Sequence, residues 1–350
     1  RRWSVSPPLA KSVGGGRLMR MSRIQLGHSY DEIISVENLL EAWKAFKRGK
    51  TKKQGVQQFQ FRLMEHILSL HTDLRNKTYR HGPYKHFRIA DPKPRDIHKA
   101  SVRDRLLHHA VYRVLCPLFD KKFIYDSYSC RVGKGTHKAL YRFHDFAKRA
   151  SFSHTKTCYI LKCDIRKFFA SVDHEVLFSI LARHISNEWM AWLLVEVVGS
   201  FSSGVDGKGL PLGNLTSQLL VNIYMNEFDQ FVKHALKAKY YIRYADDFAL
   251  LSHDKTQLEQ WLIHIRKFLQ ERLKLSLHPD KVFIKTLASG VDFLGWVHFP
   301  THRVLRTSTK RRMFKYVCKR NLGSYLGLCG HGNTHKLQAA ITRIAEQSSE

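Results

Sequence analysis

The stretch YIRYADDFALLS, residues 241–252, sets two adjacent carboxylates, Asp246 and Asp247, between runs of aromatic and apolar residues. The flanks predict two strands, over residues 240–244 and 248–251, with the aspartates at the bend between them. Carboxylates this close repel each other when both are ionised, so a pair that lines a cleft indicates a divalent cation. The alternative is a solvated surface hairpin, because Asp is common in turns.

A third carboxylate lies upstream, in KCDIRKFFASVDH. Asp164 follows an apolar run that begins at residue 159, which predicts a strand ending at this aspartate. Beside the hairpin it would complete three hard oxygen ligands for Mg²⁺. Two such ions about 4 Å apart can activate a hydroxyl and stabilise a leaving phosphate, as in polymerases and nucleases. Spacing alone does not show that Asp164 meets Asp246.

The chain of 350 residues has a net charge of +30 at pH 7, and 43% of its residues are hydrophobic. The hydrophobic fraction fits a globular protein, and the length predicts two or three packed units. The positive charge favours a polyanionic partner, with a ribosome-like or merely adhesive basic protein as the alternative. No apolar run reaches the ~18 residues of a membrane span, so we expect a cytoplasmic protein without membrane contact.

The six cysteines form no C-x-x-C pair, and a chain of this size does not depend on disulfides, so a reducing compartment is expected. One group invites interpretation as a zinc site: Cys318, Cys329, His331 and His335. Its spacing matches no common zinc pattern, so we interpret these residues as ordinary turn and helix positions.

Residues 1–28 contain Pro7, Pro8 and a run of three glycines. This composition predicts a disordered lead, or an artefact of expression with the true start at Met19 or Met21. A basic targeting peptide is the alternative.

Apolar residues recur at helical spacing in several later segments. They predict helices over residues 36–46, 59–74, 106–115, 216–232 and 258–269, and a further helix that begins near Asp173. Short strands are predicted near residues 282–284 and 293–299. Helices that alternate with short strands, without a Gly-rich nucleotide-binding fingerprint, predict an α+β fold.

The segment THRVLRTSTKRRMFKYVCKR, residues 301–320, contains eight Lys or Arg and no acid. Arg311, Lys315 and Lys319 are four residues apart, so the spacing predicts that they line one side of a single helix. Met313 and Val317 would face the core. A stripe of one sign favours contact with nucleic-acid phosphates, with a solvated helix face as the alternative.

In this order, the motifs resemble those of reverse transcriptases. DIRKFFASVD is similar to the palm motif with the first aspartate, YADD to the signature hairpin, and LPLGNLTSQ to the template-contacting motif. The segments FRIADPKPRDIHKASVRDRLLHHAV, SYSCRVGKGTHKAL, LSLHPDK and VDFLGW resemble other family motifs. The resemblance implies a right-hand polymerase: fingers with N-terminal helices over residues 29–155, a palm with an antiparallel sheet packed on helices over 156–300, and a basic helical thumb over 301–350.

One detail separates subtypes of this family. Group II intron enzymes typically have Gln and Pro where this chain has Leu212 and Gln218, and the present pattern resembles the reverse transcriptases of diversity-generating retroelements. That resemblance implies error-prone cDNA synthesis in mutagenic retrohoming, with a template RNA, a primer–cDNA duplex, dNTPs and a small basic accessory variability protein as partners. The alternatives are another prokaryotic reverse transcriptase, from a retron, an intron remnant or an anti-phage system, and a catalytically silent RNA-binding relative.

The resemblance also implies roles for individual residues. Asp164, Asp246 and Asp247 would hold two Mg²⁺ ions, with the carbonyl of Ile165 as a further ligand. The ions would align a primer 3′-hydroxyl on the α-phosphate of a dNTP. Lys281 would neutralise or protonate the leaving pyrophosphate, unless it is a plain exposed lysine.

Further residues would contact the incoming nucleotide or its template: Lys93, Arg95, Phe169, Leu212, Gly213 and Gln218. Lys93 and Arg95 would grip the triphosphate, unless they are two more surface cations. Phe169 would be the steric gate that crowds a ribose 2′-hydroxyl, unless it is a core aromatic. Leu212 cannot offer the hydrogen bond of an amide, which implies relaxed fidelity unless this leucine merely packs.

Overall fold

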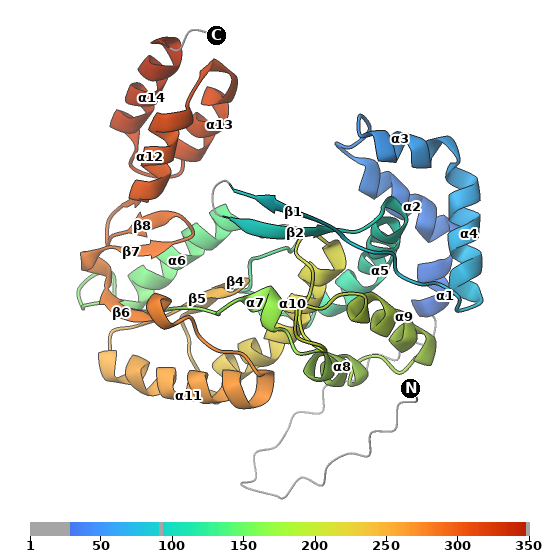
Figure 1. The fold of residues 1–350 in the computed structure, drawn as a ribbon. Helices are drawn as coiled ribbons and strands as arrows, with labels where there is room; N and C mark the ends of the chain where they lie inside the picture. Colours follow the sequence, from blue (N-terminus) through green and yellow to red (C-terminus); the bar gives the residue numbers. More distant parts are fainter. Residues whose placement is uncertain (1–28, 91–93, 348–350) are drawn as a thin grey trace, which may run out of the picture.

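The described chain begins with helices. The structure is a computed structural model that describes residues 29–90 and 94–347, so the predicted lead lies outside it. The first helices are α1 (Ser29–Ile34), α2 (Val36–Lys47), α3 (Gln54–Phe61) and α4 (Leu63–Arg75) (Figure 1). The single helix predicted over residues 59–74 is wrong, because the backbone turns at Arg62 (φ −115°, ψ 39°) between α3 and α4. Apolar positions keep their helical spacing across the break, so periodicity did not reveal it.

An antiparallel hairpin follows, made of β1 (Lys85–Ile89) and β2 (Arg95–Lys99). Both strands are basic and largely exposed, so they lack the apolar alternation by which a sequence reveals a strand. Next come α5 (Val102–Asp120) and α6 (Thr136–Ala150). Ser101 Oγ caps α5 by accepting a hydrogen bond from the Asp104 N–H.

A four-stranded antiparallel sheet lies at the centre, in the order β4-β5-β3-β6. Its strands are β3 (Tyr159–Asp164), β4 (Tyr241–Tyr244), β5 (Asp247–Ser252) and β6 (Phe283–Thr286). Leu161 and Cys163 pack with α10 (Leu215–Gln230) and α11 (Lys255–Leu273), whereas Ile160 packs with α6 and the C-terminal strands. Because side chains alternate along a strand, Lys162 and Asp164 share the face of Ile160.

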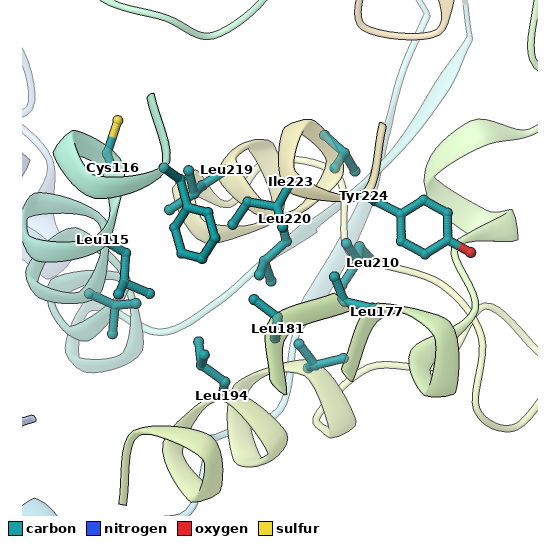
Figure 2. Close-up of a cluster of buried hydrophobic side chains, with 14 of the residues drawn as sticks. Leu115, Cys116, Leu177, Leu181, Leu194, Leu210, Leu219, Leu220, Ile223 and Tyr224 are labelled. Carbon is teal, nitrogen blue, oxygen red and sulfur yellow. The ribbon is translucent and has the colours of Figure 1, made fainter. Parts of the chain in front are cut away.

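The chain between β3 and β4 forms helices that support α10: α7 (Phe168–Ser171), α8 (His174–Ala182), α9 (Glu188–Gly199) and, after α10, the π-helix η1 (Phe231–Ala235). Helix α8 begins where the sequence predicted, with Asp173 as its cap. Figure 2 shows leucines of α8, α9 and α10 meeting in one cluster beside α5. Burying each such side chain contributes about 1.5–3 kcal/mol, so this cluster fixes α10 beneath the central sheet.

A second small sheet precedes the C-terminal helices: β7 (Val291–Phe293), β8 (Trp296–His298) and β9 (Arg303–Leu305). The single strand predicted near residues 293–299 is wrong, because positive φ at Leu294 and Gly295 turns the chain into a hairpin. The short helices η2 (Pro279–Lys281) and η3 (Leu287–Ser289) flank β6.

Three helices end the described chain: α12 (Thr307–Tyr316), α13 (Lys319–Cys329) and α14 (His335–Gln347). Met313 and Val317 are buried, as predicted. The prediction of one continuous basic helix is wrong, however, because the chain leaves the helix after Tyr316 and Lys319 begins α13. Arg311 and Lys315 therefore share α12, and Lys319 stands on the next helix.

Candidate active site

The register of β3 and β5 brings the upstream aspartate to the hairpin. Asp164, the last residue of β3, is paired directly with Asp247, the first residue of β5. Asp246 lies in the turn before it, and its carbonyl accepts a hydrogen bond from the Ile165 N–H at 3.3 Å. Directly paired residues have Cβ atoms ~4.5–5.5 Å apart. The three aspartates therefore lie together at one end of the central sheet, although Asp164 and Asp246 are 82 positions apart in the sequence.

The hairpin turn is two residues long. Tyr244 pairs with Asp247, which leaves only Ala245 and Asp246 between the strands. The sequence predicted both aspartates at the bend, but Asp247 opens β5 instead. Ala245 has φ 57°, a left-handed conformation that is uncommon for a residue with a Cβ atom. Such a conformation needs support from its surroundings.

A buried ion pair supplies that support. Arg243 and Asp229 are fully buried, with Nη2 2.6 Å from Oδ2. Arg243 Nη1 also donates to the Ala245 carbonyl at 3.0 Å, and the Tyr241 hydroxyl donates to Asp229 Oδ1 at 2.7 Å. The guanidinium therefore ties α10 to the peptide just before Asp246. Sequence reasoning missed this pair, although an arginine inside the apolar run YIRY was a signal for it.

Two lysines approach the carboxylates. Lys281 Nζ lies 3.0 Å from Asp164 Oδ1, so the structure brings this predicted residue to the aspartates. Lys162 Nζ lies 2.6 Å from Asp247 Oδ1. Sequence reasoning missed Lys162, although the alternation of β3 places residues 162 and 164 on the same face.

The electrostatics of the site disfavour ionised carboxylates. Burial raises the pKa of Asp246, and the charge of Asp164 raises it further. Burial also raises the pKa of Asp247, to about 6, although the ammonium of Lys162 lowers it. A divalent cation would relieve both effects, because it favours the charged form of every carboxylate around it. The donor chemistry, hard oxygens in a partly buried cluster, fits Mg²⁺.

Within residues 29–90 and 94–347, no group of three or more His, Cys, Asp or Glu side chains is arranged as a metal site. At the aspartates, the neighbouring positive charge comes from the two lysines. In the same ranges, Cys318, Cys329, His331 and His335 are likewise not arranged as a metal site.

The structure links the segments around Phe169 and Leu212 by backbone hydrogen bonds. Leu210 N–H donates to the Phe169 carbonyl at 2.8 Å, and His98 N–H donates to the Leu212 carbonyl at 3.1 Å. The exposed hairpin β1–β2 is therefore fastened to the segment before α10. Gly213 has φ 111°, and a Cβ atom there would lie 3.2 Å from Ile97. Only glycine combines this backbone conformation with such close packing.

Of the remaining predicted residues, those that the structure describes lie on β2, α10 and the C-terminal helices. Arg95 is exposed at the start of β2, and Lys93 lies outside the described residues. Gln218 is partly buried in the first turn of α10. Arg311, Lys315 and Lys319 are exposed on the C-terminal helices, which stand away from the hairpin β4–β5 (Figure 1).

None of the helices in the described ranges is both long enough and apolar enough to cross a membrane.

Known proteins resemble the chain in sequence and fold. The family Reverse transcriptase (RNA-dependent DNA polymerase) matches residues 88–298. Protein YkfC of Escherichia coli is 26% identical over 290 residues, 72% of this chain and 74% of YkfC. Group II intron-encoded protein LtrA of Lactococcus lactis is 24% identical over 334 residues, 75% of this chain and 54% of LtrA.

Telomerase from Candida albicans, solved with a TWJ fragment of telomeric RNA, has a similar fold. The TM-score is 0.51 at 13% identity, over 76% of this chain and 54% of that chain. This likeness agrees with the right-hand polymerase architecture predicted from the motifs, with mixed helices and antiparallel sheets. Since the family match spans more than half of the sequence and includes all three aspartates, the chain belongs to the reverse transcriptase family of RNA-dependent DNA polymerases.

Proposed function

We propose that the chain copies an RNA template into cDNA, with Asp164, Asp246 and Asp247 as its catalytic carboxylates. The observation that carries this proposal is the pairing of Asp164 with Asp247 across β3 and β5, one residue from Asp246. A primer–template duplex would lie over this end of the central sheet. Its long-range attraction would come from the net charge of +30.

The aspartates and the Ile165 carbonyl would hold two Mg²⁺ ions. Bound there, the ions would supply Lewis acidity for attack of the primer hydroxyl and departure of pyrophosphate. The chain's own residues would position the reactants. Lys281, whose Nζ lies 3.0 Å from Asp164 Oδ1, could turn its ammonium toward the departing phosphates because its side chain is about half exposed. Phe169 would limit space at the ribose of the incoming dNTP.

The fingers, palm and thumb of a right-hand polymerase would follow one another along the chain. We propose fingers up to about residue 155, a palm from there to about 300, and a thumb formed by α12, α13 and α14. Lys93 and Arg95 would meet the triphosphate from the fingers hairpin, and Leu212, Gly213 and Gln218 would lie near the templating pair. The exposed Arg311, Lys315 and Lys319 would contact the duplex backbone from the thumb.

We further propose that the enzyme serves a diversity-generating retroelement, with an RNA template repeat and a small accessory protein as partners. Leu212 and Gln218, in LPLGNLTSQ, support this subtype. The similarity to LtrA supports the alternative of an intron-derived enzyme. The gene neighbourhood separates the two, because a retroelement requires a template repeat near this gene and a matching variable repeat in a target gene.

Primer extension tests the activity. Wild-type protein should extend a DNA primer on an RNA template in the presence of Mg²⁺, and Asp246→Asn should reduce the rate by at least about 10³-fold. Glu259→Gln, on the exposed side of α11, removes one acid elsewhere and should extend at the wild-type rate. Equal extension by wild type and Asp246→Asn would assign the activity to another site or to a contaminant.

A further inference from the structure

A small cavity lies where α2, α5 and the start of α10 meet. Its volume is about 220 Å³, and its lining includes Phe46, Lys50, Arg105, His109 and Asn214. None of the three carboxylates of the candidate active site lines it. The cavity is therefore distinct from the cluster of aspartates, although Gly213 and Gln218 of the template-contacting motif line it.

The lining of this cavity contains two cations and no carboxylate. Within the described residues Lys50 and Arg105 form no salt bridge; Lys50 Nζ donates to the Phe46 carbonyl at 2.7 Å, and Arg105 Nε donates to the Ser101 carbonyl at 3.2 Å. Burial lowers the pKa of Lys50, and the nearby Arg105 lowers it further. Burial lowers the pKa of His109 to about 4, with added repulsion from Lys50 and Arg105. The carboxylate of Asp104, whose charge acts on His108 of the lining, does not line the cavity and accepts hydrogen bonds from the Tyr79 and Ser101 hydroxyls. Two partly buried cations without a counter-charge favour a bound anion.

The start of α10 adds a second, independent signal. Asn214 is only 2% exposed, and neither its Oδ1 nor its Nδ2 has a hydrogen-bond partner. Its position is the N-cap of a 16-residue helix, yet its side chain does not cap the helix. Leaving a buried polar group unpaired costs ~1–3 kcal/mol, and such a group calls for a ligand or another explanation. Helix N-termini bind phosphate groups through their N–H groups and dipole.

The position of the cavity identifies the source of the phosphate. In Figure 1, helices α12 to α14 lie at the upper left and helix α2 at the upper right, with the hairpin β1–β2 between them. A duplex held between the thumb and the aspartates would direct its uncopied template strand away from the thumb. Gly213 lines the cavity, and the neighbouring Leu212 accepts the hydrogen bond from β2. The uncopied strand would therefore pass this motif and reach the cavity.

We propose that this cavity binds a backbone phosphate of the single-stranded template ahead of the active site, held by Lys50, Arg105 and Asn214. The inference rests on the proposed function. It adds a phosphate site that would hold the template in register before each nucleotide is copied.

The test measures how binding depends on the template overhang. The full-length protein is titrated, without dNTPs, with primer–template duplexes whose 5′ template overhangs run from 0 to about 8 nucleotides. Wild-type affinity should rise several-fold once the overhang is long enough to reach the cavity. Arg105→Gln should lose most of this gain in affinity. The slope of log K against log salt concentration for the overhang contribution should become shallower by about 0.7, the value for one phosphate contact on a single strand. Lys267→Gln, which removes an exposed cation from α11, should keep the gain.

A second variant separates binding from folding. Asn214→Leu replaces an unpaired buried amide by an apolar side chain of similar size, so its free energy of unfolding should not decrease. It should nevertheless lose the overhang gain. A large drop in the unfolding free energy together with an intact overhang gain would instead assign Asn214 a structural role and overturn the proposal.

Two further outcomes also overturn it. Arg105→Gln could lose no more of the overhang gain than Lys267→Gln does. Alternatively, the overhang gain could be the same in wild type and Arg105→Gln. Inorganic phosphate, compared with chloride at equal ionic strength, would in that case raise the melting temperature of wild type but not of the variant. The ligand would then be a free phosphate. Failure of the proposed function is distinguishable, since it would appear as absent primer extension by wild type.

Discussion

Lys162 and Asp247 lie on adjacent strands of the central sheet, and Lys162 Nζ approaches Asp247 Oδ1 to 2.6 Å. Lys162 is only 8% exposed, so its ammonium is held beside the carboxylate by the sheet. Two opposite charges in a partly buried site attract strongly. This lysine lies beside an oxygen that a metal ion would use, so the ammonium and a bound ion would compete for that carboxylate.

We therefore expect Lys162→Met to change the metal dependence of the enzyme. Without the ammonium, Asp247 loses a charge that lowers its pKa, so the acidic limb of the pH–rate profile should move to higher pH. Above pH 8, where Asp247 is ionised in both proteins, half-saturation should need several-fold less Mg²⁺ because a competing cation is gone. Primer extension over a range of Mg²⁺ concentrations at several pH values measures both effects. Lys285→Met, an exposed lysine on β6, is the matched control, and identical profiles for the two variants would contradict this account.

The raised pKa of Asp247 also predicts a pH-dependent stability. Its pKa in the folded protein, about 6, exceeds the ordinary value of 3.8. The folded state therefore binds this proton more tightly, and the contribution of Asp247 to stability falls as the pH rises from about 4 to about 6. Asp247→Asn cannot lose a proton there. In metal-free buffer, the free energy of unfolding of Asp247→Asn should therefore increase relative to that of wild type as the pH rises through this window, by up to about 3 kcal/mol.

Urea unfolding at pH 4, 5, 6 and 7.5 measures this difference. Glu259→Gln, an exposed acid on α11, should show little pH dependence relative to wild type. A constant difference between Asp247→Asn and wild type at all four pH values would mean that the pKa of Asp247 is not raised by folding.

The buried pair of Arg243 and Asp229 makes a different prediction. Arg243→Met should lower the free energy of unfolding by about 3–5 kcal/mol, because it leaves a carboxylate buried without its partner. The double variant Arg243→Met with Asp229→Leu should recover part of that loss, since no isolated charge remains. The double variant should nevertheless extend primers more slowly than wild type, because the hydrogen bond to the Ala245 carbonyl is absent. Urea unfolding and primer extension on the same preparations separate stability from activity, and wild-type extension by the double variant would deny the pair a role in holding the turn.

Particular residues explain how far the sequence could predict this molecule. The strand ending at Asp164 and the hairpin at Asp246 followed from local apolar runs bounded by charge. That these two aspartates meet is a long-range property, and only the family resemblance predicted it. The break at Val317 between α12 and α13 escaped notice because Met313 and Val317 keep helical spacing across it. The partner of Arg243 could not be found from periodicity, since Asp229 lies on a helix 14 residues earlier.

Leu212 carries the prediction about fidelity. Its carbonyl accepts a hydrogen bond from the His98 N–H of the hairpin β1–β2, and the next residue, Gly213, packs against Ile97. The backbone of this segment is therefore fixed, and a side chain at 212 can change without moving it. Gln at this position would offer a hydrogen bond near the templating pair, worth ~1–2 kcal/mol of discrimination, or about 5–30-fold.

Leu212→Gln should accordingly lower misincorporation opposite template bases by several-fold while primer extension continues. Sequencing of cDNA copied from a defined RNA measures the error frequency at each base. Leu68→Gln, the same change at an exposed position of α4, controls for the substitution itself. Unchanged error frequencies in Leu212→Gln would mean that this leucine only packs, and the cause of any infidelity would then lie elsewhere among the residues around the nascent pair.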